Sequence, residues 1–323
     1  MRWENTTLTQ RPKLTAVSVD GLNSYFTNYT KYVKDQVFGR DQWIDLQSLA
    51  ETTLFQKTQS GGILLGKEHR MFARRYRVLP SEEKTWNKNL AAVSSLSERC
   101  PGKVSFMLVP SASTVYPGKG CPFAAPQDGR GSPHQRSREC GAGRAFHQCP
   151  SGSVRPQGRV SLLSHGPPLD DAGAYYAYEA FCKELGLTPF DRSTHTVETA
   201  EDFYGTHYSK ARTWNAEPDT ITWYDLQNKL TIWNVTGPGQ PTDGTETGLY
   251  DTAKLDVYDK YAMFLHGNNG LSRVEGDGTG KILVIKDSYA NSFVPYLTAN
   301  YWGHRRGRLP QLQLRAGPAH RRQ

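Results

Sequence analysis

The sequence contains no long apolar segment. None of its 323 residues falls in an apolar run of about 18 or more, so no segment is expected to cross a membrane. The first five residues are not followed by an apolar stretch, so we expect no signal peptide or anchor there. No unit repeats at a fixed period. The length suits one large hydrophobic core, or one core with a smaller subdomain.

One internal segment lacks six residue types that occur elsewhere in the chain. Residues 117–171 include no Tyr, Trp, Ile, Thr, Asn or Met, although the whole chain has 17 Tyr and 7 Trp. The segment holds Cys121, Cys140 and Cys149 and is dense in Gly, Pro, Arg and Ser. This composition predicts disorder rather than a disulfide framework.

The formal charge of +8 comes from two segments. A charge of +3 falls in residues 117–171 and +6 in residues 302–323, so the rest of the chain carries −1. Strong basicity usually directs attention to nucleic acids. These stretches are not interleaved with aromatic residues, so we expect no nucleic-acid partner.

Both basic segments are compatible with a shifted reading frame. Residues 166–170 read G-P-P-L-D, and their codons read one base later permit Asp-His-His-Trp-Thr. The tail after residue 301, read in the same way, permits a run of mostly Val, Ala or Ile followed by polar residues, which is typical of a buried strand. We interpret both segments as frame-disrupted; the alternatives are a natural linker and a natural basic tail.

Helix-like and strand-like patterns alternate in the remaining chain. Apolar spacing predicts helices over residues 24–37, 43–53, 81–100 and 172–185. Strand patterns occupy residues 63–65, 103–110 and 219–230, residues 235–250 are typical of a loop, and residues 256–265 of a short helix or a strand–helix junction. This order favours an alternating α/β fold. Cys100 and Cys182 are expected to be lone buried thiols.

The segment at residues 280–293, G-K-I-L-V-I-K-D-S-Y-A-N-S-F, is the strongest candidate for a site. Its four consecutive apolar residues, 282–285, predict a buried parallel strand that ends at Asp287 and Ser288. Residues 291–299 then have helical spacing. A serine at such a junction lies at the carboxyl edge of a sheet, where helix N–H groups can stabilise an oxyanion. The alternative is that Asp287 or Ser288 only caps the helix.

Two histidines and three tryptophans have both a functional and a structural interpretation. His207 and His266 lie in polar loops, and we interpret each as a surface or hydrogen-bonded histidine rather than a catalytic base. Trp214, Trp223 and Trp233 could stack on sugar rings, but core packing is the expected role of at least two of them.

Four motifs together resemble the DHHW family. They are the segment at residues 280–293, F-Y-G-T-H-Y-S-K at 203–210, H-G-N-N-G at 266–270 and A-G-A-Y-Y-A-Y-E-A-F at 172–181. The resemblance covers residues 4–116 and 172–301. The Asp-His-His-Trp motif that names the family would stand directly before residue 172, where the shifted frame permits it. The family looks related to SGNH-type hydrolases and to alginate O-acetylation proteins.

The resemblance implies a fold and a domain organisation. Residues 81–301 would form a three-layer α/β/α SGNH-like domain with a mostly parallel central sheet, interrupted by the anomalous residues 117–171. Residues 1–80 would form a helical and extended region packed on this core, and residues 302–323 an aberrant tail. Family members are extracytoplasmic, either membrane-anchored or secreted.

The resemblance also implies a site and an activity. Ser288 would be the nucleophile, with Asp287 as an adjacent candidate, whereas the Asp and His of the D-H-H-W motif are missing from the chain as written. Because a serine hydroxyl needs a base and an acid to orient that base, turnover is expected to be impaired. Candidate substrate-binding residues are Thr206, Tyr208, Ser209, Lys210, Asn268, Asn269 and Asn291.

The implied reaction is acyl transfer or deacylation of O-acetyl groups on a cell-surface or secreted polysaccharide. A membrane-bound O-acyltransferase is the expected partner, and neither a cofactor nor a metal is expected. The alternative is a non-catalytic protein that binds or assembles polysaccharide.

Overall fold

The structure is a computed structural model that describes residues 9–14, 18–73, 79–107, 109, 112, 144–146, 171–233, 244–301 and 315–316. At residues 144–146, 171–172 and 315–316 only the backbone is described. The predictions for the anomalous residues 117–171 and for the tail at residues 302–323 therefore lie almost wholly outside the described residues.

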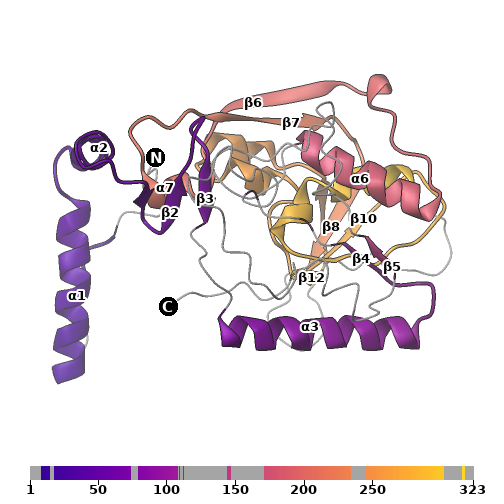
Figure 1. The fold of residues 1–323 in the computed structure, drawn as a ribbon, viewed down its shortest axis with the longest axis horizontal. Helices are drawn as coiled ribbons and strands as arrows, with labels where there is room; N and C mark the ends of the chain where they lie inside the picture. The colour runs from indigo at the N-terminus through magenta and orange to yellow at the C-terminus, as the bar shows by residue number, and fades with distance from the viewer. Residues whose placement is uncertain are drawn as a thin grey trace.

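Two helices, α1 (Val19–Asp35) and α2 (Arg40–Thr53), lie at one side of the molecule (Figure 1). They confirm the helices expected at residues 24–37 and 43–53. The hydroxyl of Ser18 caps α1 by accepting from the Gly21 N–H at 3.1 Å, and Gly39 begins α2 with a left-handed φ of 64°. No residue of α1 is buried.

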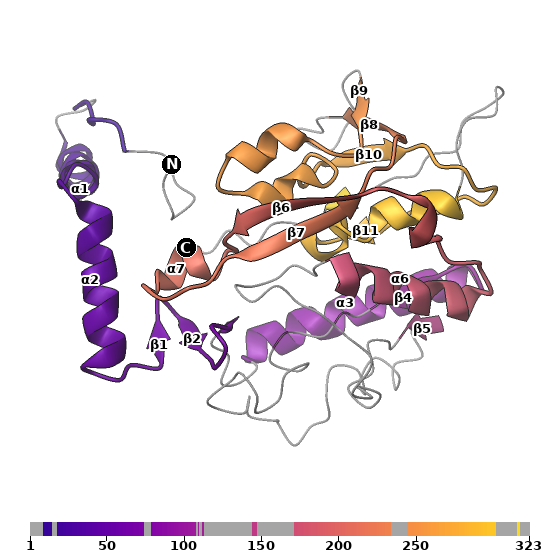
Figure 2. The same ribbon diagram turned by 90° about the horizontal axis from the view of Figure 1, so that it is seen from above.

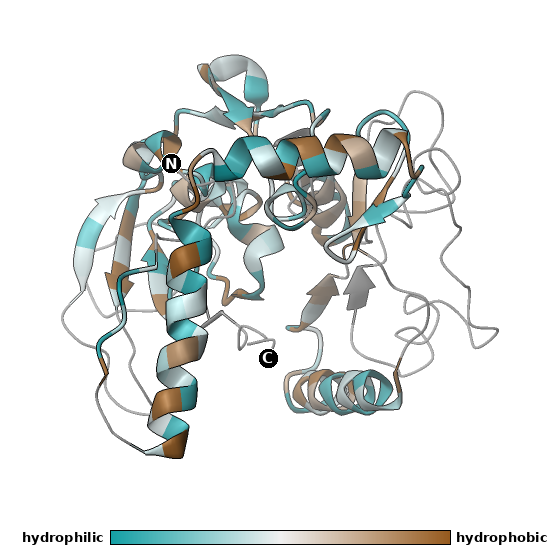
Figure 3. Cartoon of the chain, turned by 90° about the vertical axis from the view of Figure 1, so that its left-hand side faces the viewer, coloured by the Kyte–Doolittle hydropathy of each residue, from teal (hydrophilic) through white to brown (hydrophobic). Residues whose placement is uncertain are grey.

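Both helices carry exposed apolar side chains. Figure 3, which faces this side of the molecule, shows brown residues along them. The exposed large hydrophobic residues here are Val19, Phe26, Tyr29, Val33, Val37, Phe38, Trp43, Leu46, Leu49, Leu54 and Phe55. Helix α2 is attached to the rest of the fold through polar contacts, including Asp45 to Arg212 at 3.3 Å.

A small antiparallel sheet joins the N-terminal region to the rest of the chain. It contains β1 (Gln59–Ser60), β2 (Ile63–Leu65) and β3 (Met71–Ala73) and lies against the short helix α7 (Tyr208–Ala211). The Ser60 hydroxyl donates to the carbonyl of Ala211 at 3.0 Å. The turn between β1 and β2 needs glycine, because Gly61 has a φ of 54° and its backbone lies against the carbonyl of Lys210.

A long helix and a short parallel strand pair follow. Helix α3 (Pro80–Arg99) confirms the helix expected at residues 81–100, and the carboxylate of Glu82 accepts from the Leu79 N–H at 3.1 Å at its start. The strand β4 (Ser105–Met107) lies within the predicted strand at residues 103–110 and pairs in parallel with β5 (Arg144–Phe146).

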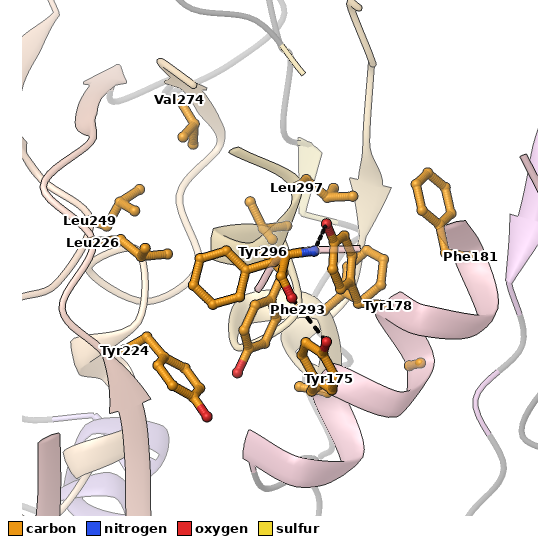
Figure 4. Packing of buried hydrophobic residues seen from close by; sticks show 14 of the residues in the cluster. Tyr175, Tyr178, Phe181, Tyr224, Leu226, Leu249, Val274, Phe293, Tyr296 and Leu297 are labelled. Atoms are coloured by element: carbon orange, nitrogen blue, oxygen red, sulfur yellow. Dashed lines mark hydrogen bonds between the residues drawn. The ribbon is translucent and has the colours of Figure 1, made fainter. Parts of the chain in front are cut away.

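The largest core cluster forms around α6 (Asp171–Leu185), which confirms the helix expected at residues 172–185. Tyr178 is fully buried and stacks on Tyr296, as Figure 4 shows. Phe190 is tied to the same helix, because its N–H donates to the Tyr178 hydroxyl and its carbonyl accepts from Tyr175, each at 2.9 Å. Burying these large aromatic rings stabilises α6 against the C-terminal part of the fold.

Both cysteines outside the anomalous segment are free thiols. Cys182 is buried in α6, as expected, and burial raises the pKa of its thiol. Cys100 is only half-buried, at the end of α3.

Two further antiparallel sheets follow α6 and the 3₁₀ helix η1 (Arg192–Thr194) (Figure 2). One pairs β6 (Val197–Phe203) with β7 (Asp219–Tyr224). The other has the order β10-β8-β9, from β8 (Lys229–Trp233), β9 (Thr245–Gly248) and β10 (Leu271–Val274). Residues 219–230, expected as one strand, therefore belong to two strands, and the predicted loop at residues 235–250 contains β9.

The last described elements are short. They comprise the 3₁₀ helices η2 (Thr252–Asp256) and η3 (Lys260–Met263), the parallel pair β11 (Ile285–Lys286) and β12 (Arg315–Ala316), and the 3₁₀ helices η4 (Ser288–Asn291) and η5 (Val294–Ala299). The helix expected at residues 291–299 is thus not an α-helix. Pro295 has no N–H to donate to the carbonyl of Asn291, which disfavours an α-helical turn at this position.

The prediction of a three-layer α/β/α fold with a mostly parallel central sheet is wrong. In the described residues each sheet has only two or three strands, and the parallel pairs β4–β5 and β11–β12 are two-stranded. The expected buried strand at residues 282–285 pairs only at its end. Leu283 and Ile285 are exposed, whereas Ile282 and Val284 pack against the core, so one face of this segment points to solvent.

Candidate functional site

The end of β11 presents Ser288 to solvent. Asp287 continues the extended backbone for one residue past the strand, with φ −96° and ψ −171°, and Ser288 then begins η4. Asp287 is the helix cap, because its Oδ1 accepts from the Tyr289 N–H at 3.0 Å. Ser288 is exposed, and within the described residues no hydrogen bond engages its Oγ. Capping is therefore the role of Asp287 and leaves the serine hydroxyl accessible.

A buried tyrosine holds the backbone on both sides of η4. The hydroxyl of Tyr261, in η3, lies 3.3 Å from the Ser288 carbonyl oxygen and 3.0 Å from Ser292 Oγ, and it accepts from the Ser292 N–H at 3.2 Å. Burial raises the pKa of Tyr261, so its hydroxyl stays protonated and can donate. The position of Ser288 is thus coupled to the core beneath it.

A lysine and two asparagines form a polar chain beside Ser288. Lys286 Nζ donates to Asn291 Oδ1 and lies 3.5 Å from the carbonyl oxygen of Asp287. Asn291 is buried, and its Nδ2 donates to Oδ1 of Asn268 at 3.4 Å. Burial lowers the pKa of Lys286 to about 8, which the nearby Asp287 carboxylate partly opposes.

The turn at residues 266–270 places Asn268 next to η4. Three consecutive residues, Leu265, His266 and Gly267, have left-handed φ values of 55°, 57° and 85°. The amide of Asn269 donates to the Leu265 carbonyl at 2.7 Å and closes the turn. Asn269 therefore has a structural contact, whereas Asn268 is exposed beside Asn291.

Neither histidine considered above is placed as a free base. His266 Nε2 lies 3.1 Å from the Gly248 carbonyl, and its Nδ1 lies 3.5 Å from Asp251 Oδ2. His207 is buried, with Nδ1 3.2 Å from the carbonyl of Met71. Both rings are hydrogen-bonded within the fold, as the structural interpretation predicted.

The structure does not bring residues 206–210 to the Ser288 region. Figure 2 shows α7 next to β1 at the end of the molecule near α2, and β11 in the middle of the molecule. Thr206 and Lys210 are exposed, Ser209 donates to the Thr206 carbonyl at 2.9 Å, and Tyr208 is buried against Ile63 and Met71. This loop connects the β1–β3 sheet to the core. Of the predicted substrate-binding residues, Asn268 and Asn291 contact each other near Ser288, with Asn269 in the same turn.

The three tryptophans considered above differ in burial and in what they contact. Trp223 is buried in a core cluster, and Trp233 is half-buried in β8. Trp214 is 48% exposed, but its indole N–H donates to Thr52 Oγ1 at 2.9 Å, which ties it to α2. Core packing is therefore the role of Trp223, and Trp214 helps to attach α2.

Sequence reasoning missed Lys286, Tyr261 and Asp251. Lys286 could have been found, because it lies only two residues before Ser288 in a segment that the sequence already predicts to be extended. Among the described residues, no group of three or more His, Cys, Asp or Glu side chains could hold a metal ion. No described helix is long and apolar enough to cross a membrane.

Comparison with known proteins finds a family model that matches the C-terminal part of the chain. Residues 168–304 match the family model described as DHHW protein. A DHHW family protein from Eubacterium siraeum DSM 15702 has a similar structure, with a TM-score of 0.55 and 19% identity over 79% of this chain and 82% of that one. The O-acetyltransferase domain of Pseudomonas putida AlgJ aligns with a TM-score of 0.35 and 18% identity, over 51% of this chain and 66% of that domain. No curated protein matches the sequence significantly.

Proposed function

We propose that the chain forms an acyl-enzyme on Ser288 and transfers or hydrolyses O-acetyl groups of a polysaccharide, because residues 168–304 match the DHHW family model. The observation that carries this proposal is the exposed Ser288 hydroxyl at the start of η4, where Asp287 already supplies the cap. A serine that is not needed for capping, at the end of a strand and anchored through its backbone, is suited to nucleophilic attack.

The reaction starts with attack of Ser288 Oγ on the acetyl carbonyl carbon while a base accepts the hydroxyl proton. The tetrahedral intermediate collapses when the bond to the sugar oxygen breaks, and that oxygen takes up a proton. Water or a second sugar hydroxyl then attacks the acetyl group on Ser288 and regenerates the serine. The expected helix N–H donors for the oxyanion are partly engaged, since the Tyr289 N–H bonds to Asp287.

The substrate class rests on the sequence resemblance to the family. The same resemblance supports an extracytoplasmic location and a membrane-bound O-acyltransferase as the source of acyl groups, and the reaction needs no cofactor. The exposed amide of Asn268 lies beside η4, where it can donate to a sugar hydroxyl or an acyl oxygen. Because the Asp-His-His-Trp motif is missing from the chain as written, we propose that turnover is slower than in a chain with both frames restored.

A chromogenic acetate ester and a fluorophosphonate probe test the proposal together. We expect slow release of p-nitrophenol and a covalent adduct on Ser288 that peptide mass spectrometry locates. Ser288→Ala should abolish both signals. The matched control is Ser193→Ala, since Ser193 is an exposed serine in η1, another 3₁₀ helix capped by an aspartate, Asp191. Equal labelling of the Ser288→Ala variant would refute the proposal.

A second candidate is a non-catalytic polysaccharide-binding or assembly protein. The missing Asp-His-His-Trp motif favours it, because a scaffold needs no acid–base pair. Glycan-array binding that survives Ser288→Ala unchanged, together with no adduct in the wild type, would support this alternative against the enzyme.

A further inference from the structure

Lys286 precedes Ser288 by two residues in an extended segment. Successive side chains of an extended segment point to opposite sides, so residues two apart share a side. Lys286 is the last residue of β11, and the extended φ and ψ of Asp287 carry the alternation on to Ser288. The Asp287 carboxylate points instead to the Tyr289 N–H.

The side-chain nitrogen of Lys286 contacts residues at both ends of η4, the 3₁₀ helix that begins at Ser288. Its Nζ lies 3.5 Å from the Asp287 carbonyl oxygen, which belongs to the peptide bond preceding Ser288. It also donates to Oδ1 of Asn291, the last residue of η4. Both contacts are with residues on either side of Ser288 in the chain, so the amine is held against η4 rather than extended into solvent.

The charged groups around Lys286 do not neutralise it. Among the described residues no carboxylate oxygen lies within ion-pair distance of its Nζ, and the charge of Asp287 only partly opposes the lowering of its pKa by burial. On the paired strand β12, Arg315 lies opposite Ile285 and Ala316 opposite Lys286. Tyr261 contacts the neighbouring Ser288, and Asn268 contacts the Asn291 that accepts from Lys286; both of these side chains are neutral. Burial without a paired carboxylate favours the neutral amine, which can accept a proton.

We propose that Lys286 is the general base and acid of Ser288 in this chain, with Asn291 and Asn268 as the residues that position its amine. This inference rests on the function proposed above and supplies the proton acceptor that the missing motif would otherwise provide. The neutral Nζ takes the proton of Ser288 Oγ as Oγ bonds to the acyl carbonyl carbon. When the carbon–oxygen bond of the ester breaks, the Nζ proton goes to the departing sugar oxygen.

The test is the rate of fluorophosphonate labelling of Ser288 between pH 6 and pH 10. In the wild type we expect the rate to rise with pH and to level off above about 8, where the amine is neutral. In Lys286→Arg the positive charge and the donors are kept, but arginine does not lose its proton in this range. We expect its labelling rate to fall by about 100-fold or more and the rise near pH 8 to disappear.

Two controls separate catalysis from structure. Lys281→Met removes an exposed lysine of the same segment and should label like the wild type. In Lys286→Ala, added ethylamine should restore labelling in proportion to the neutral amine, which a purely structural lysine would not allow. The melting curve of each variant verifies that it is folded.

The outcomes distinguish the two proposals. A wild-type chain that gives no adduct on Ser288 at any pH would refute the proposed function, and this inference with it. Labelling of Ser288 in Lys286→Arg at the wild-type rate and with the wild-type pH dependence would overturn only the role of Lys286.

Discussion

Replacing Tyr261 with phenylalanine tests whether the Ser288 region depends on the core beneath it. The substitution keeps the ring, which packs against Phe264 with centroids 5.1 Å apart, and removes only the hydroxyl. That hydroxyl contacts the Ser288 carbonyl and both the N–H and the Oγ of Ser292. Its loss leaves the Ser292 N–H without this acceptor in a buried position.

The expected loss of unfolding free energy in Tyr261→Phe follows from these contacts. Leaving a buried backbone donor unsatisfied costs about 1–3 kcal/mol of unfolding free energy. Because η4 is fixed at both ends by the same hydroxyl, Ser288 should also sample other orientations. We therefore expect Tyr261→Phe to lower the unfolding free energy by about 1–3 kcal/mol and to slow fluorophosphonate labelling of Ser288 in molecules that remain folded.

Tyr258→Phe is the matched control. Tyr258 is also buried, and its hydroxyl donates to a backbone carbonyl, that of Gly205, at 3.2 Å, but it belongs to the cluster around α7. Urea unfolding and labelling are measured on both variants. Tyr258→Phe should lose stability without losing labelling rate. If the two variants label Ser288 equally fast, the coupling between Tyr261 and the candidate site is refuted.

Three further predictions concern the turn at Gly61, the cap of η4 and the pH dependence of stability. A Cβ at Gly61 would lie 2.1 Å from the Lys210 carbonyl oxygen, whereas a Cβ at Gly62 would meet no atom within 4 Å. Gly61→Ala should therefore increase trypsin cleavage between β1 and β3 more than Gly62→Ala does. Asp287→Ala should lower the unfolding free energy by about 0.5–2 kcal/mol, and Asp287→Asn by less, because asparagine can still cap; equal losses in urea titrations would contradict this. The pKa of Lys286 falls from 10.5 to about 8 on folding, so the unfolded chain binds more protons between these values and stability contributed by this group rises with pH there. Lys286→Met should lack that rise in urea titrations at pH 7.5 and pH 10; an unchanged slope would contradict the assignment.

Local patterns predicted the helices well. The apolar spacing in α1, α2, α3 and α6 is a property of neighbouring residues, so the sequence alone located them to within a few residues. The strands were harder. The run at residues 282–285 has the composition of a strand buried on both faces, yet Leu283 is 54% exposed and Ile285 66%. Whether a second layer covers a strand depends on distant segments, which a local pattern does not record.

The candidate site shows the same division between local and long-range information. Ser288, Asp287 and Asn291 lie within four residues of one another, so their proximity could be predicted. The contact between Asn291 in η4 and Asn268 in a turn joins residues 23 apart in the chain, and it depends on three left-handed residues before Asn268. Residues 206–210 are equally polar, but their packing against β1–β3 directs them elsewhere, and no spacing rule reveals this.

The single hydroxyl of Tyr261 has a consequence for how the molecule opens. Amide deuterium uptake at Ser292 requires release of a buried hydrogen bond to Tyr261, which packs in the same cluster as Met263 and Phe264, so exchange there should approach the rate of global opening. In α1, where no side chain is buried, exchange should need only fraying. Gentle heating would then release the N-terminal helices first, while the strand end that carries Ser288 keeps its shape.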